Sequence, residues 1–232
     1  MAPHVRYYQR LLARDEDEAS VLANRKIAEL GSVAAMDEVL VPALRLAEQH
    51  HARDEITGED LDFILESTAE IVALARAKNQ TDQLGEAGIL MMSTRAPADR
   101  IVLDMLATTI EASGRRVATI SSTESLEGMV ERAISERPEL TCVVAVSATR
   151  GSEARSICRR IRAARPNAKL LALRPLPDGA DAARSVARMK EAGANRVAIN
   201  LRQALDEVQS MLGPVSASEA SVAQDERLVQ SA

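Results

Sequence analysis

Apolar positions recur every three or four residues through the first third of the chain, which predicts amphipathic α-helices. The predicted helices span 7–12, 15–30, 32–55 and 57–78. Gly31 is expected to end the second helix, Ser32 to be the N-cap of the third, and Pro42 to kink it. Thr57, which acidic residues follow, is the expected cap of the fourth helix. This pattern predicts a helical bundle over residues 1–78.

From residue 88 onward, short apolar runs alternate with helical periodicity. The polar, glycine-bearing stretch 79–87 predicts a linker. The predicted strands are 89–92, 116–120, 142–147, 169–173 and 196–200, and the helices that follow them are 97–113, 122–137, 151–165, 179–193 and 201–212. Strict alternation predicts an α/β domain over 88–213, a five-stranded parallel, doubly wound sheet of Rossmann-like or flavodoxin-like type with strand order 2-1-3-4-5. Residues 214–232 lack apolar periodicity and are expected to form a disordered tail.

Bulk composition argues against nucleic acid as a partner and against a membrane-spanning segment. The aromatic residues Tyr7, Tyr8 and Phe63 all precede residue 64, so the second domain lacks the rings on which single-stranded nucleic acid stacks. The net charge of −5 also argues against nucleic acid. No apolar run approaches the ~18 residues of a membrane span, so we expect a cytoplasmic protein.

Neither a metal site nor a catalytic centre is expected. His50 and His51 are adjacent, and adjacent residues on a helix point about 100° apart, so they are poorly placed to share one ion. Cys142 and Cys158 fall in an apolar strand and a helix, which favours core thiols in a reducing compartment. The chain has no Gly-x-Ser-x-Gly motif, and no histidine follows residue 51 to act as a base.

Hydroxyl and guanidinium groups follow the ends of three predicted strands. They are Ser93, Thr94, Arg95, Ser147, Thr149, Arg150 and Arg174. In a doubly wound sheet these ends converge beside helix N-termini, whose free N–H groups favour anions. Two interpretations stay open: a pocket for a small anionic ligand or nucleotide, and polar side chains that solvate the ends of loops.

The predicted helix 151–165 is the most basic stretch. Arg155, Arg159 and Arg162 lie four and three residues apart, so they share one face, while the apolar residues of the helix face the sheet. The face is either a solvated surface or a docking site for an acidic protein or an anionic membrane surface.

A helical bundle followed by a five-stranded domain resembles the cobalamin-binding module of methyltransferases and light-sensing regulators, over roughly residues 15–210. The segment "VLVPALRLAEQHHARDEIT" resembles a bundle segment of that family. The segment "VVAVSATRG" resembles its third strand, which ends in a serine that touches the nucleotide tail of the cofactor. The resemblance implies the fold of this module.

The cofactor motifs of that family are replaced in this sequence. The family has Asp-x-His-x-x-Gly after its first strand, with the histidine as cobalt ligand, and the aligned positions hold Ser93, Arg95 and Ala98. Arginine stays protonated and has no lone pair for a metal. A Gly-Gly after the fourth strand and a Glu-His on the bundle correspond to Arg174, Pro175, Leu61 and Asp62. We therefore expect a degenerate site without cobalamin as cofactor.

Two other families share features with this sequence. The phrase "YYQRLLARDEDEA" resembles the start of soluble C-terminal regions that follow the membrane domain of autoinducer-2 exporter-type permeases. This resemblance implies either the cytosolic domain of a permease or a partner of one at the inner face of the membrane. Response-regulator receivers share the sheet, but Ser93, Ser147 and Asn200 stand where their acidic, phosphoacceptor and lysine residues are needed.

We expect a non-enzymatic regulatory or interaction module with a protein partner. The alternative is a sensor that binds a small anionic ligand at the strand ends, and histidine-independent cobalamin binding is the third hypothesis. Self-association is left open.

Overall fold

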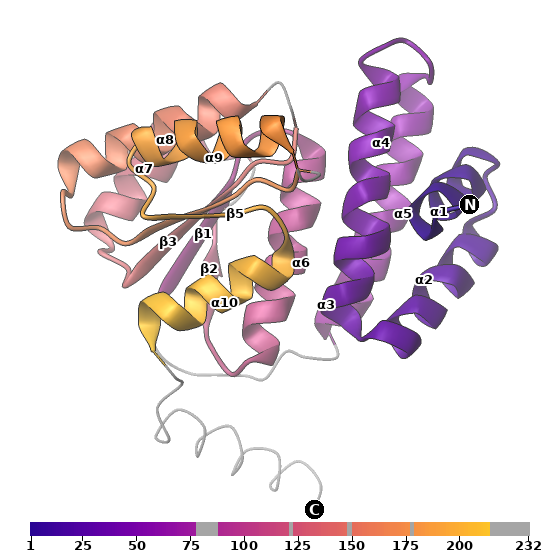
Figure 1. Cartoon of the computed structure of the whole chain (residues 1–232), viewed down its shortest axis with the longest axis horizontal. Helices are drawn as coiled ribbons and strands as arrows, with labels where there is room; N and C mark the ends of the chain where they lie inside the picture. Colours follow the sequence, from indigo (N-terminus) through magenta and orange to yellow (C-terminus); the bar gives the residue numbers. More distant parts are fainter. Residues whose placement is uncertain (78–87, 121–122, 148–149, 177–178, 214–232) are drawn as a thin grey trace, which may run out of the picture.

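The computed structural model describes residues 1–77, 88–120, 123–147, 150–176 and 179–213. A helical bundle lies beside a doubly wound sheet (Figure 1). The stretch 79–87 expected to be a linker, the expected tail 214–232 and Thr149 lie outside the described residues.

The bundle consists of α1 (Pro3–Leu12), α2 (Glu16–Leu30), α3 (Ser32–Ala35), the π-helical turn η1 (Met36–Leu40), α4 (Val41–His51) and α5 (Gly58–Ala77). Asp15 caps α2, because its carboxylate accepts the backbone N–H of Glu18 at 3.2 Å. The predicted cap of α5 is confirmed. The Thr57 hydroxyl accepts the N–H of Asp60 at 3.1 Å, and the Asp60 carboxylate accepts the N–H of Thr57 at 3.1 Å.

The segment from Ser32 to His51 differs from the prediction at both ends. Gly31, with a φ of 82°, is the N-cap, and Ser32 is the first helical residue without a capping bond, so the predicted cap was wrong by one position. The helix ends at His51 rather than at residue 55. The irregularity expected at Pro42 takes the form of the π-helical turn η1, which widens the helix just before a residue that has no N–H to donate.

The sheet has the predicted order β2-β1-β3-β4-β5, with all neighbours parallel. Its strands are β1 (Ile89–Ser93), β2 (Val117–Thr119), β3 (Leu140–Val144), β4 (Leu170–Leu173) and β5 (Arg196–Ala198). The helices that alternate with them are α6 (Pro97–Ala112), α7 (Leu126–Ser135), α8 (Gly151–Ala164), α9 (Ala180–Glu191) and α10 (Leu201–Leu212). The α/β fold class is therefore confirmed.

Alternate residues of each strand face two different cores. Ile89 and Met91 of β1 pack with α6, α10 and the bundle, whereas Leu90 and Met92 pack with α7, α8 and α9. The bundle thus extends the core on one face of the sheet, and α5 lies along α6 (Figure 1). Among the residues described, no helix is both long and apolar enough to span a membrane.

Polar contacts fix the bundle on this face. The Asp37 carboxylate accepts the backbone N–H groups of Leu201 at 2.7 Å and Arg202 at 2.9 Å, so a residue of the bundle caps α10. Arg76 of α5 forms ion pairs with Asp104 and Glu111 of α6, at 3.2 and 2.8 Å. These contacts hold α4 near the carboxyl ends of the strands.

Candidate functional site

The carboxyl ends of β1 and β3 form the topological switch point of the sheet. The helices that follow them, α6 and α8, lie on opposite faces, which is the arrangement that opens a ligand crevice in doubly wound sheets. Ser93 ends β1 and Thr94 follows it, and both side chains are buried. The crevice between these two strand ends is therefore the candidate ligand site.

Asp99, which the sequence did not single out, spans this crevice. It lies in the first turn of α6 with 0% of its surface exposed. One carboxylate oxygen accepts the backbone N–H groups of Val146 and Ser147, at 2.7 and 2.9 Å, and the Thr94 hydroxyl donates to the other. Burial raises the pKa of Asp99, and these hydrogen bonds oppose the rise. Backbone N–H groups that an anionic ligand would need are thus bonded to the protein's own carboxylate.

Arg174 meets the same segment from the other side. It follows β4, is 5% exposed, and donates through Nη1 to the carbonyl oxygens of Ala145 at 2.6 Å and Ser147 at 3.0 Å. Burial lowers the pKa of Arg174, and the charge of Asp99 raises it. Asp99 and Arg174 together satisfy the donors and acceptors of the chain as it leaves β3.

Glu48 of α4 in the bundle lies near the carboxyl ends of the strands. Burial, and after it the charge of Asp99, raises the pKa of the Glu48 carboxyl to about 7, although a hydrogen bond with the Ser147 side chain and the nearby Arg150 and Arg174 oppose this. The sequence contains a signal for this residue. Glu48 lies four and seven positions after the buried residues Leu44 and Val41, so a carboxyl group continues an apolar stripe of the helix.

Two of the predicted pocket arginines have an acidic partner within the chain. Arg95 lies 3.5 Å from Glu153, and Arg150 lies 3.4 Å from the same carboxylate. The structure therefore divides the predicted set: Thr94, Ser147 and Arg174 gather around Asp99 and the end of β3, and Arg95 and Arg150 gather around Glu153. The anion pocket built from these residues stays a prediction.

The arginines on the basic face of α8 also differ in their contacts. Arg162 donates to the carbonyl oxygen of Gly193 at 2.8 Å and to the Asn195 side chain at 2.6 Å, so its guanidinium holds the loop between α9 and β5. Arg159 is exposed and its Nε contacts the carbonyl oxygen of Arg155 at 3.4 Å. A docking role for this face stays a prediction.

The remaining chemistry-bearing residues serve the core. The Tyr7 hydroxyl bonds with Thr68 at 3.0 Å, and the Tyr8 hydroxyl with His50 Nδ1 at 2.7 Å. Burial raises the pKa of both cysteine thiols to about 12. Within the described ranges, no cluster of three or more His, Cys, Asp or Glu side chains has the arrangement of a metal site.

Comparison with solved structures identifies the fold. The monomethylamine corrinoid protein of Methanosarcina barkeri is similar over 89% of this chain and 97% of its own, with a TM-score of 0.66 and 13% identity. A cobalamin-binding protein from Desulfitobacterium hafniense DCB-2 is 16% identical over the same shares of the two chains, but its TM-score is 0.46, and the fold assignment rests on the first match. No protein-family model matches the chain, and no curated protein matches it in sequence. The chain has a cobalamin-binding-like fold.

Proposed function

We propose that this chain is a non-enzymatic regulatory or interaction module that uses a cobalamin-binding-like fold without the cofactor. The observation that carries the proposal is the closed switch point, where the Asp99 carboxylate accepts the N–H groups of Val146 and Ser147 and Arg174 donates to the carbonyl oxygens beside them. A crevice whose polar groups are already paired offers a ligand little to bind.

The residues at the end of β1 do not fit a corrinoid. By resemblance, the cobalt ligand belongs at Arg95, whose guanidinium has no lone pair for a metal and is paired with Glu153. Arg174 stands where the family has the first residue of its Gly-Gly pair, and its long side chain crosses to the end of β3. Both features support a module that works without cobalamin.

The positions of the histidines and the burial of the cysteines support a non-enzymatic role. All three histidines precede residue 52, which keeps them within the bundle sequence. The thiols of Cys142 and Cys158 are buried, and burial raises their pKa to about 12, so neither supplies a thiolate near neutral pH. Regulation or interaction is therefore the activity that we assign.

We propose a protein as the partner, and the resemblance of residues 7–19 makes a membrane permease the first one to test. Tyr7 and Tyr8 within that stretch are buried in the bundle, so they support packing and present no surface to a partner. A permease with a cytosolic domain of this type, co-expressed with the tagged chain, should hold it in the membrane fraction. Recovery of the chain in the soluble fraction alone would contradict this partner.

Cobalamin retention tests the central proposal. The purified chain is mixed with hydroxocobalamin or adenosylcobalamin and passed through gel filtration, with the apo form of the Methanosarcina barkeri corrinoid protein as positive control. We expect the visible absorption of the cofactor to elute with the control and to separate from this chain. Co-elution of either cobalamin with this chain at one equivalent would overturn the proposal and support histidine-independent binding.

A further inference from the structure

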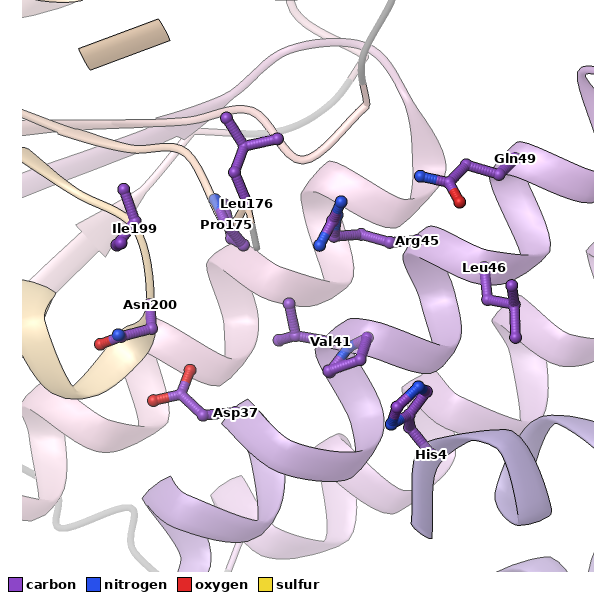
Figure 2. Close-up of a pocket in the computed structure, with 11 residues that line it drawn as sticks. His4, Asp37, Val41, Arg45, Leu46, Gln49, Pro175, Leu176, Ile199 and Asn200 are labelled. Carbon is purple, nitrogen blue, oxygen red and sulfur yellow. The ribbon is translucent and has the colours of Figure 1, made fainter. Parts of the chain in front are cut away.

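A cavity of about 480 Å³ lies between α4 and the loops that follow β4 and β5 (Figure 2). Val41, Arg45 and Gln49, each four residues from the next, line it from one face of α4. Glu48, on the same helix, instead has a side-chain hydrogen bond with Ser147 at the crevice that Asp99 spans. Its volume is in the range of sites that hold small molecules.

The opposite wall is held in place by hydrogen bonds. Pro175 and Leu176 follow β4, and Ile199 and Asn200 follow β5. The N–H of Leu176 donates to the carbonyl oxygen of Ile199 at 3.4 Å, and the Asn200 side chain accepts the N–H of Gln203 at 2.7 Å. The wall therefore lies at the carboxyl edge of the sheet, and its hydrogen bonds preorganise it for a ligand.

Arg45 is the unusual group in this cavity. It has no hydrogen bond or ion pair with any residue that the structure describes, and burial lowers its pKa. Figure 2 shows its guanidinium extending from α4 toward Pro175 and Leu176. A half-buried cation without a counter-ion is costly, because desolvation is not repaid by an attraction.

The acidic residue of the same cavity does not neutralise Arg45. Both carboxylate oxygens of Asp37 accept backbone N–H groups at the start of α10, so its charge is directed to that helix. The walls are otherwise rich in apolar side chains, among them Val41, Leu176 and Ile199. As far as the described residues go, the cavity thus combines an uncompensated positive charge with an apolar surface.

We propose that this cavity binds a small amphipathic anion, a carboxylate or phosphate monoester on an apolar body. The charged group is held by Arg45, whose planar guanidinium donates two parallel hydrogen bonds to either acid, and the body packs against the apolar wall. Such a ligand contacts the bundle and the loops of the sheet together, so it stabilises the docked arrangement of the two parts. Binding at this site is measured in the absence of cobalamin.

Isothermal titration calorimetry at low ionic strength tests this site. The probes are phenyl phosphate and benzoate, with inorganic phosphate and benzyl alcohol as the charged and apolar halves. We expect phenyl phosphate, benzoate or both to bind at least about tenfold more tightly than either half, because charge and apolar burial both contribute. Which of the two acids binds better distinguishes a phosphate ligand from a carboxylate ligand.

The variant Arg45→Gln should weaken binding by about tenfold or more, the loss expected for a charge-assisted hydrogen-bond pair. Arg53→Gln is the matched control, since it removes the same charge from an exposed side chain just beyond α4 and should leave affinity unchanged. Arg45 loses no hydrogen bond or ion pair with the part of the chain that the structure describes, so the melting temperature of Arg45→Gln should equal that of the parent chain. Arg45→Lys, which keeps the charge without the planar fork, should give an intermediate affinity.

Three results would overturn the proposal. Neither amphipathic anion binds the parent chain, or Arg45→Gln binds them as tightly as the parent does, or inorganic phosphate alone binds as tightly as phenyl phosphate. Because cobalamin retention is read from visible absorption, failure of this site and failure of the proposed function are distinguished.

Discussion

The carboxylate of Asp99 accepts the backbone N–H of Ser147 at 2.9 Å, which joins the first turn of α6 to the chain that leaves β3. The two residues are 48 positions apart and come from opposite sides of the switch point. The Asp99 carboxylate accepts backbone N–H groups here, as a bound anion does at other helix–strand junctions. The bond therefore links the integrity of the fold to the closure of the crevice.

Replacement of this carboxylate should destabilise the chain. In Asp99→Ala the buried N–H groups of Val146 and Ser147 lose their acceptor, and we expect the free energy of unfolding to fall by about 2–4 kcal/mol. Urea denaturation followed by circular dichroism measures the change. Asp181→Ala removes an exposed carboxylate on α9 and should alter stability by less than about 0.5 kcal/mol. Equal stability of the two variants would exclude a structural role for Asp99.

Glu48 should make stability depend on pH. Its pKa in the folded chain is about 7, above the ordinary value of 4.5, so the folded state holds this proton more tightly than the unfolded state does. The favourable contribution is fully present below the ordinary value and is lost as pH rises through about 7. After allowance for solvent screening, we expect the titration of Glu48 to lower the free energy of unfolding by about 1–3 kcal/mol between pH 5 and pH 8.

The variant Glu48→Gln isolates this contribution, because it keeps the shape of the side chain without a titrating proton. Unfolding measured across the same pH range should show a flatter profile, with the variant more stable than the parent at pH 8 and similar to it at pH 5. Glu66→Gln, an exposed change on α5, should follow the parent profile. A parent-like slope in Glu48→Gln would show that the carboxyl of Glu48 does not titrate in this range.

The layout of the fold could be predicted because it depends on local periodicity. The central strands β1, β3 and β4 are short apolar runs buried on both faces, and each strand is followed by a segment with helical spacing, so the alternation and the strand order followed from the sequence. The exact ends of the helices were predicted less well. Gly31 rather than Ser32 caps α3, because the chain turns there with a positive φ that glycine adopts without strain.

The candidate site was predicted only in part, because its key contacts join distant segments. An aspartate in the first turn of a helix is ordinarily explained by the helix dipole, and nothing near Asp99 in the sequence indicates acceptance of two N–H groups from the end of β3. Arg95 and Arg150 were located at the strand ends, but their pairing with Glu153 depends on how α8 begins relative to β1. Such pairings depend on tertiary geometry, which the pattern of hydrophobic and polar residues in one sequence does not predict.

Gly193 should not tolerate a side chain. Its φ is 106°, and a Cβ atom there would lie 2.8 Å from the Cβ of Arg162. We expect Gly193→Ala to lower the free energy of unfolding by about 2–4 kcal/mol, from backbone strain and from displacement of the arginine that holds this loop. Gly58→Ala, where a Cβ meets nothing within 4 Å, should be within about 0.5 kcal/mol of the parent. Denaturation of both variants checks this, and a parent-like Gly193→Ala would contradict it.

Both native thiols should resist modification. Cys142 and Cys158 are buried, and burial raises the pKa of each to about 12, so little thiolate exists at pH 8 and the reagent has no access to it. We expect reaction with a chromogenic disulfide to be at least about a hundredfold slower in the native chain than in denaturant, since it requires the core to open. In Ser152→Cys, an exposed position on α8, one thiol should react at once and the other two should remain slow. Rapid reaction of two thiols in the native parent chain would show that Cys142 in β3 and Cys158 in α8 are not buried.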